Sequence, residues 1–102
     1  MYIWMKEIQT VRNSMDYIYT SGEQEIIIEV EQRDTRHSVI DQYVQCRKLQ
    51  GMTQAELAKR SGIPRSNITR FESGNYNPSL EQLVRIATAL GMTLQVQLIA
   101  KE

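Results

Sequence analysis

Four glycines divide the second half of this sequence into short stretches. Gly51, Gly62, Gly74 and Gly91 each follow a stretch whose apolar residues recur at helical spacing. Glycine just past a helix end readily takes the left-handed conformation that a side chain resists. The pattern predicts four short helices, over about 38–50, 53–61, 64–72 and 79–90. A chain of 102 residues has room for one core that these helices share.

Residues that suit helix starts support these boundaries. Ser38 is predicted to cap the first helix. Thr53 is predicted to cap the second, with Glu56 three residues on completing a capping box. Pro64 suits a first turn because its missing N–H is not needed there, and Ser79 is predicted to cap the last helix. The apolar stripe of that last helix consists of Leu80, Leu83, Ile86, Ala87 and Leu90.

Two segments outside the four helices alternate between apolar and polar residues. Residues 94–98 do so cleanly, which is typical of a half-buried strand. Residues 25–31 do so except at Ile27, so that a strand is favoured and a helix is the alternative. Because a lone strand needs a partner, we expect these two to pair with each other or with their copies across a dimer axis.

The formal net charge of zero conceals an asymmetry. Before residue 38 there are four basic and seven acidic residues, and from residue 38 onward there are eight basic and five acidic. A basic stretch suits an anionic ligand held on one face, whereas the acidic segment would be repelled by that ligand. We therefore divide the chain into an acidic appendage (1–37), a helical domain (38–91) and a C-terminal strand (92–102).

The single cysteine and single histidine give little support for redox or metal chemistry. Cys46 cannot form an intramolecular disulfide and fills a small-residue position in the core. His37 has no second ligand at metal spacing and is expected at the surface before the first helix. No secretion signal is recognisable and no apolar run approaches the roughly 20 residues that cross a bilayer. We expect a cytoplasmic protein without a membrane role.

Residues 53–72 have the spacing of a helix-turn-helix. Gly62 supplies the turn, and Ala58 is small where the second helix must cross closely. In this motif the first helix braces against the DNA backbone and the second presents its outer face to the major groove. With Ile68 and Phe71 turned inward, that face carries the candidate base-reading residues Arg65, Ser66, Thr69 and Arg70. Arginine can bind guanine through two parallel hydrogen bonds, and hydroxyls can reach base edges.

The run from Arg47 to Ala58, followed by Ser66–Gly74 and Asn77–Leu80, resembles the Cro/C1-type (XRE) helix-turn-helix family of phage repressors. The resemblance covers residues 38–91. It implies a mainly α, four- to five-helix, lambda-repressor-like domain with Arg65, Ser66 and Arg70 at base-contacting positions. Residues 90–96 are similar to the antitoxin branch of the family, whose members end in a strand used for dimerisation.

Phosphate contacts are expected from groups around the second helix of the motif. Gln54 lies at a helix N-terminus, where free amides and the helix dipole favour an anion. The other candidates are the neutral donors Asn67, Ser73, Asn75 and Tyr76 and the cations Lys48 and Lys59. Arg47 and Glu72 are expected to form a structural brace instead, because the matching pair in the family is a partly buried ion pair.

These features favour a dimeric, sequence-specific transcriptional repressor that needs no cofactor. A narrower version makes it the antitoxin of a type II toxin-antitoxin module, with the acidic N-terminal segment binding a small basic ribonuclease toxin. The alternative is a protein-interaction module whose helix-turn-helix no longer binds DNA. An enzyme is not expected, because no paired carboxylates, nucleophile-base set or phosphate loop occurs at a plausible spacing.

Overall fold

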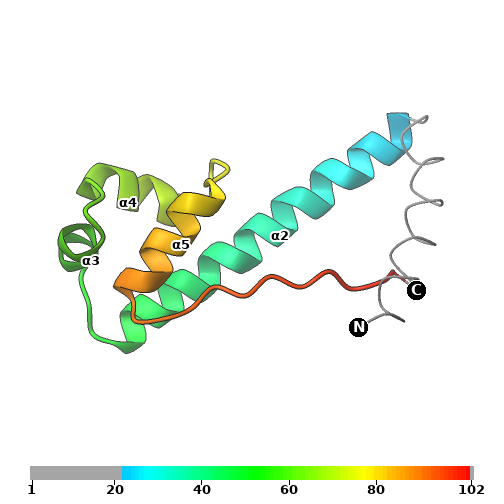
Figure 1. Ribbon diagram of the computed structural model, residues 1–102. Coiled ribbons are helices and arrows are strands. Elements are labelled where there is room, and N and C mark those ends of the chain that lie inside the picture. Colours follow the sequence, from blue (N-terminus) through cyan, green and yellow to red (C-terminus); the bar gives the residue numbers. More distant parts are fainter. Residues whose placement is uncertain (1–21, 102) are drawn as a thin grey trace. The chain divides into compact units, whose positions relative to one another are not determined.

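The computed structural model describes residues 22–101, which contain four helices and irregular connections (Figure 1). The helices are α2 (Gly22–Leu49), α3 (Gln54–Ser61), α4 (Arg65–Ser73) and α5 (Leu80–Ala89). By its contacts the chain divides into two units. One is Arg33–Leu94, and the other contains, of the described residues, 22–32 and 95–101.

The unit Arg33–Leu94 is built around a core to which all four helices contribute. Leu57, Ile68, Phe71 and Ile86 have the largest fully buried side chains. Tyr43 of α2 meets Phe71 of α4 edge to face, with ring centroids 5.3 Å apart. In Figure 1 α3, α4 and α5 gather against the end of α2 that carries this core. Burial of Ile68 and Phe71 fixes which side of α4 faces outward.

The predicted helix ends of this unit are largely confirmed. The four glycines that follow helical stretches all have positive φ, between 67° and 75°. Thr53 caps α3, since its hydroxyl accepts a 3.1 Å hydrogen bond from the Glu56 N–H. Ser79 caps α5 in the same way, accepting from the Gln82 N–H at 3.0 Å. Pro64 is the N-cap of α4 rather than part of its first turn.

The N-terminal prediction was wrong, because α2 begins at Gly22 and not near Ser38. Residues 25–31 are therefore helical, and the favoured strand is replaced by the alternative. Nothing between residues 23 and 50 is glycine or proline, so no residue stops the helix. Two glutamates in the first turn and Arg47 and Lys48 in the last complement the helix dipole. Residues 1–21 of the predicted appendage, and Glu102, lie outside the described residues.

The C-terminal strand is also absent, since residues 92–101 are irregular and no strand occurs anywhere within residues 22–101. Leu94 packs partly against the core, whereas Val96, Leu98 and Ile99 are exposed. A strand needs another strand to satisfy its backbone groups, and residues 22–101 of a single copy supply none. Within the second unit, the Lys101 ammonium lies 2.9 Å from a Glu31 carboxylate oxygen.

Leu80 is a smaller correction to the predicted core. It is the first residue of α5 and is 64% exposed, whereas Ile86, Ala87 and Leu90 are buried and Leu83 is partly buried. Cys46 packs against the core as expected. None of the described helices combines the length and the hydropathy that a bilayer-crossing segment requires.

The buried phenol of Tyr43 is expected to make the free energy of unfolding fall at alkaline pH. Its hydroxyl donates to the Leu83 carbonyl at 2.9 Å, and burial raises its pKa above the usual 10.0. A pKa raised by folding stabilises the native state below about pH 10, and this contribution is lost as pH rises through the native pKa. We predict that Tyr43→Phe costs about 1 kcal/mol at pH 7.

The same variant should lose less stability than the wild type between pH 9 and 11.5, as measured by urea unfolding at several pH values. An identical alkaline decline in both proteins would show that Tyr43 ionisation does not contribute.

Candidate nucleic-acid interface

The turn between α3 and α4 occupies residues 62–64. The Gly62 N–H donates to the Ala58 carbonyl at 2.9 Å, which closes α3, and the left-handed Gly62 backbone redirects the chain. Ala58 packs partly against the core, and α3 and α4 contact each other. The two helices and this turn form the helix-turn-helix that the spacing predicts.

The outer face of α4 is polar and exposed. Four polar residues recur there at helical spacing and lie at the surface: Arg65, Ser66, Thr69 and Arg70. On the opposite side, Ile68 and Phe71 are 0% exposed. The structure therefore brings the four predicted base-reading residues together on one face. Within the described part of the chain, the Arg65 side chain makes no hydrogen bond or ion pair, so its guanidinium is available to a ligand.

Arg70 differs from Arg65 because an aromatic ring holds it. Its guanidinium carbon lies 4.7 Å from the centroid of the Tyr76 ring, a cation–π arrangement. The Tyr76 hydroxyl in turn donates to Gln82 on α5 at 2.9 Å. The loop that follows α4 therefore sets the direction of one predicted base-reading side chain.

Arg47 and Glu72 form the ion pair that joins α2 to α4. Two parallel hydrogen bonds of 2.7 and 2.9 Å connect the guanidinium to the carboxylate, and the side chains are only 12% and 8% exposed. A third Arg47 donor reaches the Met52 carbonyl at 2.7 Å, just before α3. Such a bidentate pair has a defined geometry as well as an attraction.

Gln54 extends this brace toward the outer face of α4. Its amide nitrogen donates to Glu72 at 3.0 Å, and its amide oxygen accepts from the Thr69 hydroxyl at 2.9 Å. Gln54 was predicted only as a phosphate ligand, and no local pattern in the sequence indicates these two contacts. The brace, defined as Arg47, Glu72, Gln54 and Thr69, connects three helices.

The remaining phosphate candidates come from three places. Asn67 and Ser73 are exposed on α4, and Asn75 and Tyr76 belong to the loop after it. The Ser73 hydroxyl donates to the Arg70 carbonyl at 2.6 Å and accepts from the Asn75 N–H at 3.3 Å, which shapes the start of this loop. Lys48 and Lys59 are exposed on α2 and α3.

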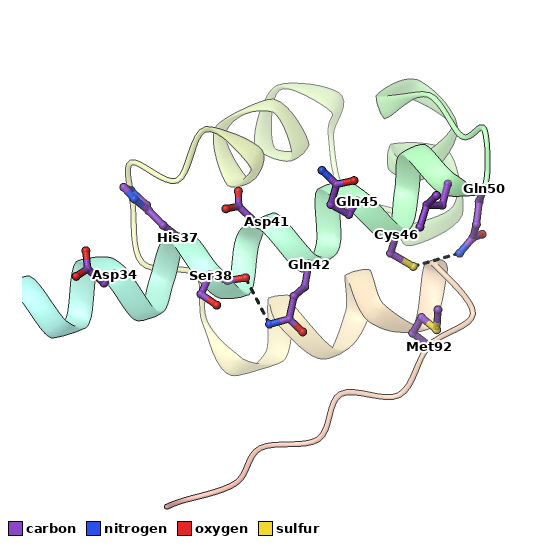
Figure 2. Close-up of a pocket in the computed structure, with 10 residues that line it drawn as sticks. Asp34, His37, Ser38, Asp41, Gln42, Gln45, Cys46, Gln50 and Met92 are labelled. Carbon is purple, nitrogen blue, oxygen red and sulfur yellow. Dashed lines mark hydrogen bonds between the residues drawn. The ribbon is translucent and has the colours of Figure 1, made fainter. Parts of the chain in front are cut away.

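Sequence reasoning missed two residues of α2 that contact this loop. Arg36 donates to the Gly74 carbonyl at 2.9 Å and to the Asn77 side chain at 2.8 Å. The neighbouring His37 lies against Gly74, and Figure 2 shows it turned toward the loop. These contacts join residues about 40 positions apart in the sequence, and no local pattern signals them.

A shallow pocket of about 840 Å³ runs along α2, with Met92 at one end (Figure 2). Cys46 lies in it, and the Gln50 amide nitrogen is 3.3 Å from the Cys46 sulfur and 2.7 Å from the Leu90 carbonyl. In residues 22–101 no three His, Cys, Asp or Glu side chains gather as a metal site requires.

A polar, exposed second helix, set by a tight turn against a first helix, defines the DNA-binding helix-turn-helix class. A family model described as Helix-turn-helix matches residues 45–97. The chain belongs to the Cro/C1-type (XRE) family of helix-turn-helix transcriptional regulators, which confirms the resemblance. Members of this family are not enzymes, as expected from the sequence.

Similar proteins come from bacteria, archaea and phage. An uncharacterized HTH-type transcriptional regulator of Haemophilus influenzae is 36% identical over 76 residues, which are 72% of this chain and 78% of the relative. One from Methanothermobacter thermautotrophicus is 53% identical over 45 residues, 44% of this chain and 65% of the relative. The immunity repressor protein of Bacillus phage phi105 is 41% identical over 56 residues, 55% of this chain and 38% of the phage protein.

Among solved structures, a chain of a toxin-antitoxin module from Streptococcus pneumoniae is similar, with a TM-score of 0.57 and 28% identity. The match covers 78% of this chain and 82% of that chain. It therefore extends beyond the residues that the family model matches.

Breaking the brace from one side should be strongly destabilising. Arg47→Met leaves the Glu72 carboxylate buried without its cation, at an expected cost of about 3–5 kcal/mol in unfolding free energy. The double variant Arg47→Met/Glu72→Leu should recover most of that loss, because no buried charge remains. Urea unfolding followed by circular dichroism measures both.

Arg33→Met serves as the matched control, because Arg33 is exposed and, within residues 22–101, its side chain pairs only with the neighbouring Asp34, at 3.4 Å. A loss in Arg47→Met no larger than that of the control would contradict a structural role for the pair.

Proposed function

We propose that this protein is a cytoplasmic repressor that binds a specific operator as a dimer and inserts α4 into the major groove. The observation that carries the proposal is the exposed set Arg65, Ser66, Thr69 and Arg70 on a helix whose other side is sealed in the core. A base-reading side chain needs a fixed scaffold, because a small displacement breaks the paired hydrogen bonds to a base edge.

The flanking groups are assigned to the DNA backbone. Asn67, Ser73, Asn75 and Tyr76 offer neutral donors beside α4, and Lys48 and Lys59 offer positive charge on the two preceding helices. Backbone contacts of this kind fix register and orientation without reading sequence. Gln54 can add to them only by exchanging one of its contacts within the brace.

The dimer is proposed to form through the C-terminal segment. Residues 92–101 are irregular in one copy, and Val96, Leu98 and Ile99 expose 74%, 61% and 81% of their surface. A second copy can cover these exposed apolar side chains at the dimer interface. Two α4 helices related by a two-fold axis would then enter successive major grooves, about 34 Å apart.

A salt titration of operator binding tests the function. Selection from random duplexes should yield a palindrome with half-sites one helical turn apart, and the affinity for it should fall steeply as salt rises. Inserting five base pairs between the half-sites should abolish tight binding, because the two grooves then face opposite sides. Failure to select any duplex would leave a protein-interaction module as the better account.

Substitutions on and beside α4 should separate base reading from phosphate binding. Arg65→Ala is expected to cost about 1–3 kcal/mol of binding free energy and to relax the preference at one base pair. Lys48→Ala is expected to weaken binding to all sequences and to lower the salt slope by about one.

Competition assays with the operator and with single-base variants measure both effects. An equal loss on operator and random DNA for Arg65→Ala would remove Arg65 from the base-reading set.

We further propose that the protein is the antitoxin of a type II toxin-antitoxin module. The first part of α2 combines four glutamates, at positions 23, 25, 29 and 31, with exposed Ile26, Ile27 and Val30. An acidic helical segment that also exposes apolar residues suits a small basic protein, such as a ribonuclease whose surface must attract nucleic acid. The similarity to a chain of a toxin-antitoxin module supports this version.

Co-expression with the product of a neighbouring small gene tests the antitoxin proposal. The two proteins should co-purify, and Glu25→Lys/Glu29→Lys should weaken the complex at least tenfold at low salt, because two attractive charges become repulsive. Glu81→Lys on α5 is the control and should leave the complex intact. A neighbour that does not bind, or a complex insensitive to the double variant, would contradict the proposed acidic interface.

A further inference from the structure

We propose that Arg36 is a positioning residue for DNA binding, which holds the loop between α4 and α5 without touching DNA itself. This loop, residues 74–79, carries the predicted phosphate ligands Asn75 and Tyr76, so the inference rests on the proposed function. Arg36 lies on α2, outside the residues 45–97 that the family model matches.

The Arg36 guanidinium spans the loop from one side. Its Nε–H donates to the Gly74 carbonyl at 2.9 Å, and an Nη–H donates to the Asn77 side-chain oxygen at 2.8 Å. These partners lie three residues apart, the first at the start of the loop and the second just past its middle. The planar guanidinium has separate N–H donors that can bind both acceptors at once. A lysine ammonium is a single point of charge and does not reproduce this geometry.

Gly74 gives the loop a second attachment to α2. It is buried, its φ is 75°, and it ends α4 as the C-cap. The imidazole of His37 lies close to the place where a side chain at this position would begin, with its Cδ2 3.1 Å from an ideal β-carbon. Adjacent residues of α2 therefore contact the same glycine, one by a hydrogen bond and one by packing.

The loop also contacts a side chain of α4. Tyr76 lies between Gly74 and Asn77 in the sequence. The guanidinium carbon of Arg70 stacks over the Tyr76 ring, 4.7 Å from the ring centroid. Displacing the loop moves that ring, and with it the platform for a predicted base-reading side chain. Arg36 thus acts on Arg70 and on the phosphate ligands through the backbone of the loop.

A direct phosphate contact by Arg36 makes a different prediction. Each phosphate-binding cation contributes to the release of counterions, so its removal lowers the salt slope by about one. Removing a positioning residue lowers the affinity and leaves the slope unchanged. The salt dependence therefore distinguishes the two roles.

The first experiment compares operator binding by Arg36→Gln, Arg36→Lys and the control Arg33→Gln over a range of salt concentrations. Both Arg36 variants should bind about tenfold more weakly with an unchanged slope, since a lost charged hydrogen bond corresponds to about that factor. Arg33→Gln should bind like the wild type. Full binding by Arg36→Lys, or a slope lowered by one in Arg36→Gln, would overturn the proposal.

The second experiment needs no DNA and measures amide hydrogen exchange by NMR. In Arg36→Gln the Gly74 and Asn75 amides, which donate to the Phe71 carbonyl and the Ser73 hydroxyl, should exchange at least tenfold faster, while amides in α3 and α5 keep their protection and show that the domain is folded. Unchanged exchange in the loop would overturn the inference. If the wild type binds no duplex, the proposed function fails, and this measurement still decides whether Arg36 orders the loop.

Discussion

The ion pair between Arg47 and Glu72 is the contact on which the placement of the helix-turn-helix depends. It joins α2 to α4, and further hydrogen bonds add the start of α3 and the Thr69 side chain. A buried pair of this kind contributes little net stability, because desolvation offsets the attraction. What it supplies is geometry, since two parallel hydrogen bonds tolerate little rotation. The outward face of α4 is fixed by this pair together with the burial of Ile68 and Phe71.

Three separate attachments therefore hold one nine-residue helix. The core seals its inner side, the brace holds its flank through Thr69, and the contacts of Arg36 and His37 with Gly74 hold its C-terminal end. A helix this short has little stability of its own, so its order comes from tertiary contacts. A surface ordered before binding loses less conformational entropy when the ligand arrives. The arrangement suits recognition by a preformed surface.

Local chemistry explains how much of this could be read from the sequence. The correct predictions each depend on residues a few positions apart in the sequence. They are the glycines at helix ends, the Thr53 and Ser79 caps, and the burial of Ile68 and Phe71, all of which the structure confirms. The strand favoured at 25–31 failed because Ile26, Ile27 and Val30 also fit one helix face, and no breaker separates them from residue 38. Arg36, His37 and the bridging role of Gln54 depend on partners distant in sequence, which no periodicity encodes.

The crowded glycine at the end of α4 also constrains how such a sequence can diverge. A positive φ alone would admit asparagine at position 74, because its short polar side chain tolerates that conformation. The imidazole of His37 opposes this substitution, since its Cδ2 lies 3.1 Å from the place of an ideal β-carbon and the ring would have to shift by a few tenths of an ångström. A smaller residue at position 37 relieves this contact. The two positions are therefore coupled, because the residue at 37 changes the cost of replacing the glycine at 74.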